Sequence, residues 1–182
     1  MFVENEIYKI NICKDETFTV DSADNKPYDL VFNPSNMDRS DYYKTLSICI
    51  DVNGSQKHLA LIGSLYAGDE DIAVLKDKDL IVLMNTMLTV IDCNALTIKS
   101  CKTISDFGVY FSLHKFDDGY VVYGELDIIK LSAELETDWS FSGADIFVTL
   151  DGRCSFYIED DTICLIDWNG TEYKIDKYGN EL

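Results

Sequence analysis

The chain has 182 residues, which is enough for one sizeable hydrophobic core. Its 33 acidic residues against 15 Lys and Arg leave a formal net charge of −18. Such an excess argues against binding to nucleic acid or to anionic membranes, because those surfaces depend on clustered cations. The hydrophobic share of 47% is too high for a disordered acidic segment, so we expect one folded domain over residues 1–182.

The first 45 residues predict an irregular region of strands and loop. Short runs rich in Ile, Val, Tyr and Phe indicate β-strands, whereas the polar stretch 33–44 indicates an insertion. The Asn53-Gly54 pair predicts a tight hairpin turn between two of the strands that follow. The strands expected before residue 70 are Ile7–Cys13, Phe18–Val20, Tyr28–Phe32, Leu46–Val52 and His58–Ile62.

A repeat begins near residue 72. The segments Ile72–Leu75, Val109–Ser112 and Ile146–Thr149 follow one another at a spacing of 37 residues. An acidic turn and three more short strands follow each of them, so the units cover about 72–104, 109–141 and 146–175. Four short antiparallel strands repeating at about 40 residues predict an all-β fold of blade-like sheets within 46–182, as a small closed or partial β-propeller.

The turns inside these units carry a family resemblance. The segments Val90–Thr97, Leu131–Phe141 and Ile166–Tyr173 resemble the turn between the last two strands of PQQ-like propeller repeats. That family carries an aspartate and a Thr-Gly pair in the turn and a tryptophan after it, and Trp139 has the place of the tryptophan. The resemblance covers about residues 70–176 and implies architecture alone, since no PQQ-binding residue is carried over. We expect no cofactor.

Strand order in such sheets predicts where the acidic residues gather. The turn between the second and third strands and the connection into the next unit should lie at one end, and both are rich in acids without Lys or Arg. The alternative is that acids simply suit exposed turns. A one-sided acidic surface would favour a cationic partner. The acids expected at this end are Asp69, Glu70, Asp71, Asp106, Glu125, Asp127, Asp145, Glu159, Asp160 and Asp161.

Trp168 is the residue expected to anchor a partner. It lies in the predicted turn Asp167-Trp168-Asn169-Gly170, where a large ring should be partly exposed. Exposed aromatic side chains are frequent anchors of protein–protein interfaces.

Motifs for catalysis and metal binding are missing from the sequence. The two histidines, His58 and His114, lie in strand-like runs, so a Cys-His or Ser-His pair would have to form across separate units. There is no glycine-rich phosphate loop, and the acidic clusters do not match a calcium-binding loop. We therefore expect neither a catalytic residue nor a metal site.

The six cysteines are scattered and form no Cys-x-x-Cys motif. We expect buried, reduced thiols in place of disulfides or metal ligands. The N-terminal residues do not read as a signal peptide, and no apolar run approaches the length of a membrane span, so a cytoplasmic location is expected.

These observations favour a non-enzymatic binding protein. Small acidic β proteins without catalytic residues are similar in character to bacterial immunity proteins, including those of contact-dependent growth inhibition, whose toxins are often basic nucleases. The resemblance implies an inhibitor that covers the active site of a basic toxin. The alternative is a general propeller-like scaffold for protein interactions, with its acidity serving solubility alone.

Overall fold

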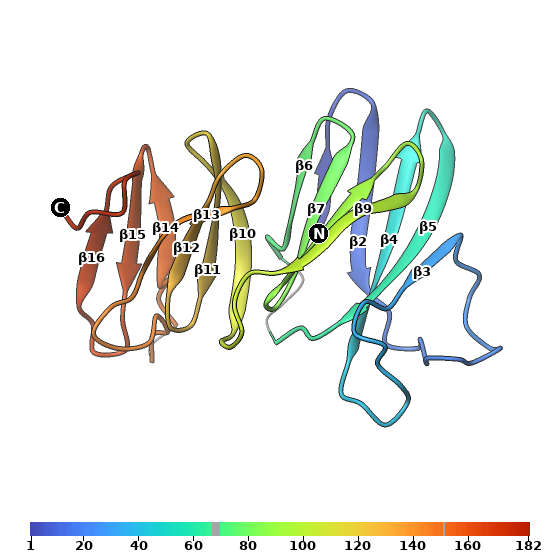
Figure 1. Ribbon diagram of the computed structural model, residues 1–182, viewed down its shortest axis with the longest axis horizontal. Coiled ribbons are helices and arrows are strands. Elements are labelled where there is room, and N and C mark those ends of the chain that lie inside the picture. The colour runs from blue at the N-terminus through green and yellow to red at the C-terminus, as the bar shows by residue number, and fades with distance from the viewer. Residues whose placement is uncertain (67–69, 151) are drawn as a thin grey trace. The chain divides into compact units, whose positions relative to one another are not determined.

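The computed structural model describes residues 1–66, 70–150 and 152–182, and these form 16 strands and no helix (Figure 1). The predicted all-β fold of blade-like sheets is confirmed. No described segment forms a helix that could cross a membrane. The chain divides into two compact units, Met1–Ser105 and Asp106–Leu182.

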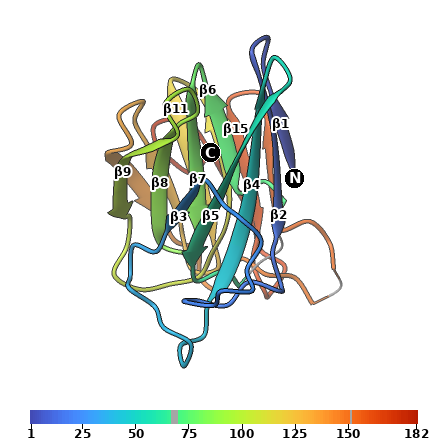
Figure 2. The ribbon, with the colours of Figure 1, turned by 90° about the vertical axis from the view of Figure 1, so that its right-hand side faces the viewer.

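The first unit contains two sheets that pack face to face. The five-stranded sheet has the order β1-β2-β4-β5-β3, with β3 parallel to β5 and the other pairs antiparallel (Figure 2). The second sheet runs in simple chain order from β6 to β9. The strands are β1 Phe2–Glu4, β2 Tyr8–Lys14, β3 Leu30–Phe32, β4 Lys44–Val52, β5 Ser55–Gly63, β6 Ala73–Lys76, β7 Asp79–Met84, β8 Met87–Asp92 and β9 Thr97–Thr103.

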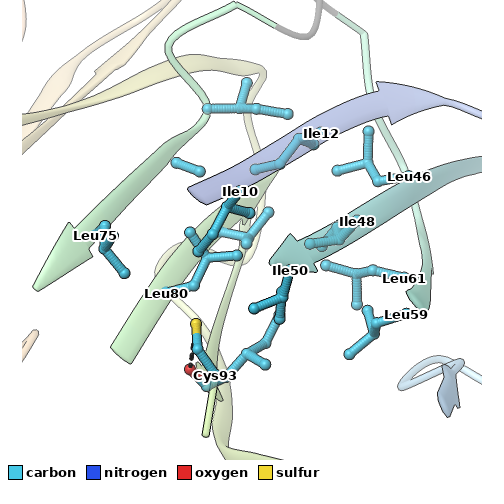
Figure 3. Packing of buried hydrophobic residues seen from close by; sticks show 14 of the residues in the cluster. Ile10, Ile12, Leu46, Ile48, Ile50, Leu59, Leu61, Leu75, Leu80 and Cys93 are labelled. Atoms are coloured by element: carbon cyan, nitrogen blue, oxygen red, sulfur yellow. Dashed lines mark hydrogen bonds between the residues drawn. The ribbon is translucent and has the colours of Figure 1, made fainter. Parts of the chain in front are cut away.

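Alternating side chains form the core of this unit. Ile10 and Ile12 on β2 are fully buried, whereas the residues between and beside them are exposed. Figure 3 shows these side chains and Ile48 on one side of the core and Leu80 on the other. A strand with one face on the core and one face open requires this period of two.

Of two local predictions for the chain before residue 70, the structure confirms one and contradicts the other. The Asn53-Gly54 hairpin is confirmed, with φ of 52° and 85° at its two turn residues. The strand predicted at Phe18–Val20 is wrong, because Asp15 orders the chain that leads into it as a turn. The Asp15 carboxylate accepts hydrogen bonds from the N–H and the hydroxyl of Thr17. The Asp15 carbonyl accepts one from Phe18 N–H. Side-chain bonding of this kind replaces a strand ladder.

The second unit contains a four-stranded and a three-stranded antiparallel sheet, each in chain order. The strands are β10 Tyr110–Phe116, β11 Gly119–Gly124, β12 Ile128–Leu131, β13 Thr137–Phe141, β14 Phe156–Glu159, β15 Thr162–Ile166 and β16 Glu172–Ile175. Phe147, Phe156, Ile163 and Tyr173 belong to the hydrophobic core of this unit.

The strand predicted at Ile146–Thr149 is wrong, although its spacing fits the repeat. This segment lies in the connection 142–155, where the Phe147 side chain is fully buried. Phe147 N–H donates to the Glu125 carbonyl, and the Ile146 carbonyl accepts a hydrogen bond from Trp168 N–H. The segment therefore joins the ends of two sheets instead of pairing along one of them.

Because residues 146–149 form no strand, the strands of the third repeat run in the direction opposite to the predicted one. Tyr123, at the end of β11, donates a hydrogen bond to the Phe147 carbonyl, and its hydroxyl lies 2.7 Å from that of Ser155. β14 therefore starts at the end of the unit where β11 finishes. A first strand at Ile146–Thr149 would have taken the chain to the opposite end before β14 began, so β14 to β16 run opposite to the predicted directions.

The hairpin between β10 and β11 depends on a close approach at Gly119. A Cβ atom there would overlap the Leu131 carbonyl oxygen and lie 2.9 Å from Lys130 Nζ. We expect Gly119→Ala to lower the free energy of unfolding by about 1–3 kcal/mol, since the backbone must move to admit a methyl group. Urea denaturation measures the change.

Gly63→Ala is the matched control, because the three atoms nearest to its added methyl group all belong to the flexible Met84 side chain, the closest being the sulfur at 3.2 Å. Its loss of stability should be clearly smaller. Equal losses for the two variants would contradict the backbone overlap at Gly119.

Candidate functional site

The second unit has two ends that differ in chemistry. One end, the connection end, comprises the described segments 106–109, 125–127, 142–150, 152–155 and 167–171 and lies at the bottom of this unit in Figure 1. The other end, the hairpin end, comprises the turns 117–118, 132–136, 160–161 and 176–180. Both assignments follow from the antiparallel order of the strands and the position of the 142–155 connection.

The predicted grouping of the acids is partly wrong. Asp106, Glu125, Asp127 and Asp145 do lie together at the connection end. Glu159, Asp160 and Asp161 lie instead at the hairpin end, because the third sheet runs opposite to the predicted direction. They join Asp117 and Asp118 there, in the turn between β10 and β11.

Two lysines offset part of the acidity of the hairpin end. Lys130 is 2% exposed, and its ammonium group lies 3.2 Å from the Asp118 carboxylate and 3.5 Å from that of Asp138. Lys177 lies 3.5 Å from Asp117, and the charges of Asp117 and Asp161 both raise the pKa of Lys177. Asp117, Asp118 and Asp161 thus take part in the protein's own charge pairing.

The connection end is distinguished by large exposed apolar side chains. Trp168 is 41% exposed, as its place in a turn predicts. Phe107, Leu126 and Leu150 are exposed by 75%, 45% and 74%, and each comes from a different segment of the same end. The sequence interpretation missed these three. Large apolar residues beside an acid in a predicted turn, as in Asp106-Phe107 and Glu125-Leu126-Asp127, are the signal that could have found them.

Hydrogen bonds hold the turn that carries Trp168. The buried carboxylate of Asp167 accepts bonds of 2.8 Å from Thr171 N–H and from the Tyr173 hydroxyl. Burial by itself raises the pKa of Asp167, but these hydrogen bonds outweigh it and hold the pKa below its usual value. The Tyr173 hydroxyl also accepts a bond from Ala144 N–H, which ties the turn to the 142–155 connection.

The four acids of the connection end have different roles. Asp145 accepts hydrogen bonds from Asn169 Nδ2 and Ile146 N–H and so orders the local backbone. Asp127 is half-buried, and burial raises its pKa although a hydrogen bond from Tyr110 lowers it in part. Asp106 is exposed and Glu125 is partly exposed. These last two carboxylates are therefore the better placed to meet a cationic partner.

The remaining predicted acids belong to the first unit. Glu70 and Asp71 lie in the connection between β5 and β6, and both are exposed. Asp71 has a φ of 52°, a conformation that Asp adopts more readily than most residues. Asp69 lies outside the described residues.

A cysteine and a histidine do come together, within one sheet and not across units. On the open face of the five-stranded sheet, Cys49 on β4 stands opposite His58 on β5 and Asn11 on β2. All three line a depression of about 340 Å³. Burial raises the pKa of the Cys49 thiol, and the charges of Asp51 and Cys13 raise it further. A nucleophilic cysteine requires a lowered pKa, so this arrangement does not activate Cys49.

A serine–histidine contact also occurs within a single strand. The Ser112 hydroxyl lies 2.8 Å from His114 Nε2, because residues two apart share one face of β10. Ser112 is 9% exposed, and the His114 ring packs on Phe156 with centroids 5.0 Å apart. The burial of Ser112 and the packing of His114 on Phe156 favour a structural role for both residues over attack on a substrate.

The cysteines are free thiols, as expected. The prediction of burial is right for Cys93 and Cys164 but wrong for Cys13 and Cys154, which are exposed. Burial raises the pKa of Cys93 to about 12. Within the described part of the chain, no three His, Cys, Asp or Glu residues lie close enough to hold a metal ion.

Comparison with known proteins finds no matching family model and no significantly similar curated sequence.

Asp127 provides a pH-dependent test of the connection end. Its folded-state pKa lies above the ordinary value of about 3.9, so ionisation at pH 7 disfavours the folded state. We expect Asp127→Asn to raise the urea midpoint at pH 7. The gain should shrink as the pH falls through the raised pKa, because the wild-type carboxyl then becomes neutral in the fold.

The matched control for this experiment is Asp106→Asn, which neutralises an exposed carboxylate at the same end. The urea midpoint of Asp106→Asn should equal that of the wild type at pH 7 and at each lower pH that is tested. A less stable Asp127→Asn variant at pH 7 would contradict the unfavourable burial of this charge.

Proposed function

We propose that the protein is a non-catalytic binding protein that inhibits a basic partner by covering its functional cleft, as an immunity protein does with a toxin. The observation that carries this proposal is the composition of the connection end. Four large apolar side chains, Phe107, Leu126, Leu150 and Trp168, are exposed there on four separate segments. Exposed apolar groups with a polar rim are typical of protein interaction sites.

The charges of this end support a basic partner. Asp106 and Glu125 lie beside the apolar side chains, on the segments that carry Phe107 and Leu126. A nuclease cleft built for phosphates presents Lys and Arg, which carboxylates attract over long range. The net charge of −18 adds to this attraction at low salt.

The apolar and acidic groups would have separate tasks in such a complex. Apolar anchors buried at the centre of an interface supply most of the binding free energy. Charges at the rim mainly accelerate association and select the partner. Trp168 is the strongest anchor candidate, since Asp167 and Tyr173 order its turn before any partner arrives and so lower the entropic cost of binding.

Two double variants with the same charge change test the location of the site. Asp106→Lys/Glu125→Lys alters the connection end, and Glu159→Lys/Asp160→Lys alters the hairpin end. With a basic nuclease domain that binds the wild-type protein as the probe, the first variant should lose about tenfold or more in affinity. The second should change only the long-range attraction, and surface plasmon resonance measures both. Equal losses would contradict a site at the connection end.

Trp168→Ala tests the anchor in the same assay. We expect the dissociation rate to rise by about tenfold or more with little change in the association rate, because an anchor acts after encounter. Tyr178→Ala is the control, since Tyr178 is an exposed aromatic residue at the hairpin end. An unchanged dissociation rate for Trp168→Ala would remove Trp168 from the site.

Salt dependence separates this proposal from a general interaction scaffold. An inhibitor of a basic enzyme should associate much more slowly as ionic strength rises, because counterions screen the long-range attraction. A scaffold whose acidity serves solubility should show an association rate that hardly changes. A flat response would therefore contradict the charge-based inhibitor.

A further inference from the structure

The three-stranded sheet of the second unit has an unpaired edge. Among the described strands, β14 pairs with β15 alone. The sequence repeat predicts a first strand at Ile146–Thr149 beside β14, but that segment lies in the connection and leaves the edge open. An edge strand with free backbone groups is a template for pairing with another chain.

The register of the hairpin identifies the free groups. The two-residue turn at Asp160-Asp161 makes Glu159 and Thr162 a hydrogen-bonded pair, followed by Tyr157 and Cys164. The N–H and C=O groups of Phe156 and Ile158 therefore point away from β15. The Cys154 thiol donates to the Phe156 carbonyl at 2.8 Å, and no described residue pairs with the two N–H groups or with the Ile158 carbonyl.

The surroundings of this edge have a defined polarity. Tyr157 is 46% exposed and Glu159 is exposed, whereas Phe156 packs inward on the Tyr123 ring with centroids 4.7 Å apart. Glu159 is the last residue of β14, and two more acids, Asp160 and Asp161, follow it in the turn. A strand added antiparallel to β14 would begin next to these carboxylates.

We propose that β14 is a docking edge for an extended segment of a partner protein, which adds antiparallel as a fourth strand and carries Lys or Arg at its amino-terminal end. Backbone hydrogen bonds would give affinity, and the charge pairing would set direction. A second copy of this chain is a weaker occupant, because it would bring a further net charge of −18. This surface is separate from the connection end, and the inference does not require the inhibitory function.

Hydrogen exchange in the free protein tests the edge itself. The amides of Phe156 and Ile158 should exchange fast, and those of Tyr157 and Glu159 slowly, because only the latter two donate to β15. NMR resolves these four amides individually. Slow exchange at all four would show that the edge is already paired and would overturn the inference.

Synthetic peptides test the added strand and its direction. One peptide of about ten residues begins with two lysines and continues with alternating Val and Thr, and a second has the same composition with the lysines at its carboxyl end. The first should bind about threefold more tightly and slow the exchange of Phe156 and Ile158. Equal or reversed affinities, or no binding by either peptide up to about 1 mM, would overturn the proposal.

Two variants of one residue test the backbone contact. Ile158→Pro removes the outward N–H without removing a bond to β15, whereas Ile158→Ala keeps that N–H and removes most of the side chain. Only Ile158→Pro should fail to bind the first peptide. Binding of that peptide by Ile158→Pro with wild-type affinity would overturn the proposal. N-methylation of alternate peptide residues gives the same test on the unaltered protein, should Ile158→Pro not fold.

The peptide assay also separates this surface from the proposed inhibitory site. Asp106→Lys/Glu125→Lys should bind the first peptide as the wild type does, since both substitutions lie at the connection end. Loss of peptide binding by that variant would overturn the assignment to β14. If the wild-type protein forms a dimer and Ile158→Pro does not, the edge binds a second copy of the chain. That result would overturn the proposal of a partner protein.

Discussion

Burial of Phe147 is the constraint on which the second unit depends. Its side chain is fully buried among the aromatic residues of both sheets, 5.9 Å from the Tyr173 ring and 6.4 Å from that of Phe141. Its backbone N–H donates to Glu125, and its carbonyl accepts a bond from Tyr123. Because these contacts hold the segment across the end of the unit, the residues around Phe147 cannot pair along β14. Two consequences follow: β14 starts from the connection end, and its outer edge has no strand beside it.

The same constraint determines the chemistry of the two ends. It places Trp168 beside Ile146 at the connection end, where Phe107, Leu126 and Leu150 are also exposed. It places Glu159, Asp160 and Asp161 at the hairpin end, near Asp117 and Lys177. The acidity of the second unit is thus divided between an end with apolar side chains suited to anchoring a partner and an end where lysines pair with some of the acids.

Local patterns in the sequence predict most of the fold because they report forces that act locally. Alternating apolar residues and the Asn53-Gly54 turn identify strands and hairpins correctly, since side-chain alternation and turn conformation are decided within a few residues. Ile146–Thr149 has the composition and spacing of a strand, but tertiary burial of Phe147 overrides that preference. One missing strand then reverses every later strand, and this is why three of the ten predicted acids lie at the wrong end. The sequence predicts that a Cys-His pair would have to form across separate units, whereas Cys49 and His58 pair within one sheet, because pairing between neighbouring strands depends on register, which composition does not reveal.

The contact between Tyr123 and Ser155 reports this reversal most directly. With four strands in the third repeat, Ser155 would lie at the hairpin end, far from Tyr123. In the structure the two hydroxyl groups are 2.7 Å apart. A nuclear Overhauser experiment on the uniformly labelled protein should show strong cross-peaks between the Tyr123 ring and the Ser155 and Phe147 protons. Cross-peaks from Tyr123 to the Asp160-Asp161 turn, with none to Ser155, would contradict the account.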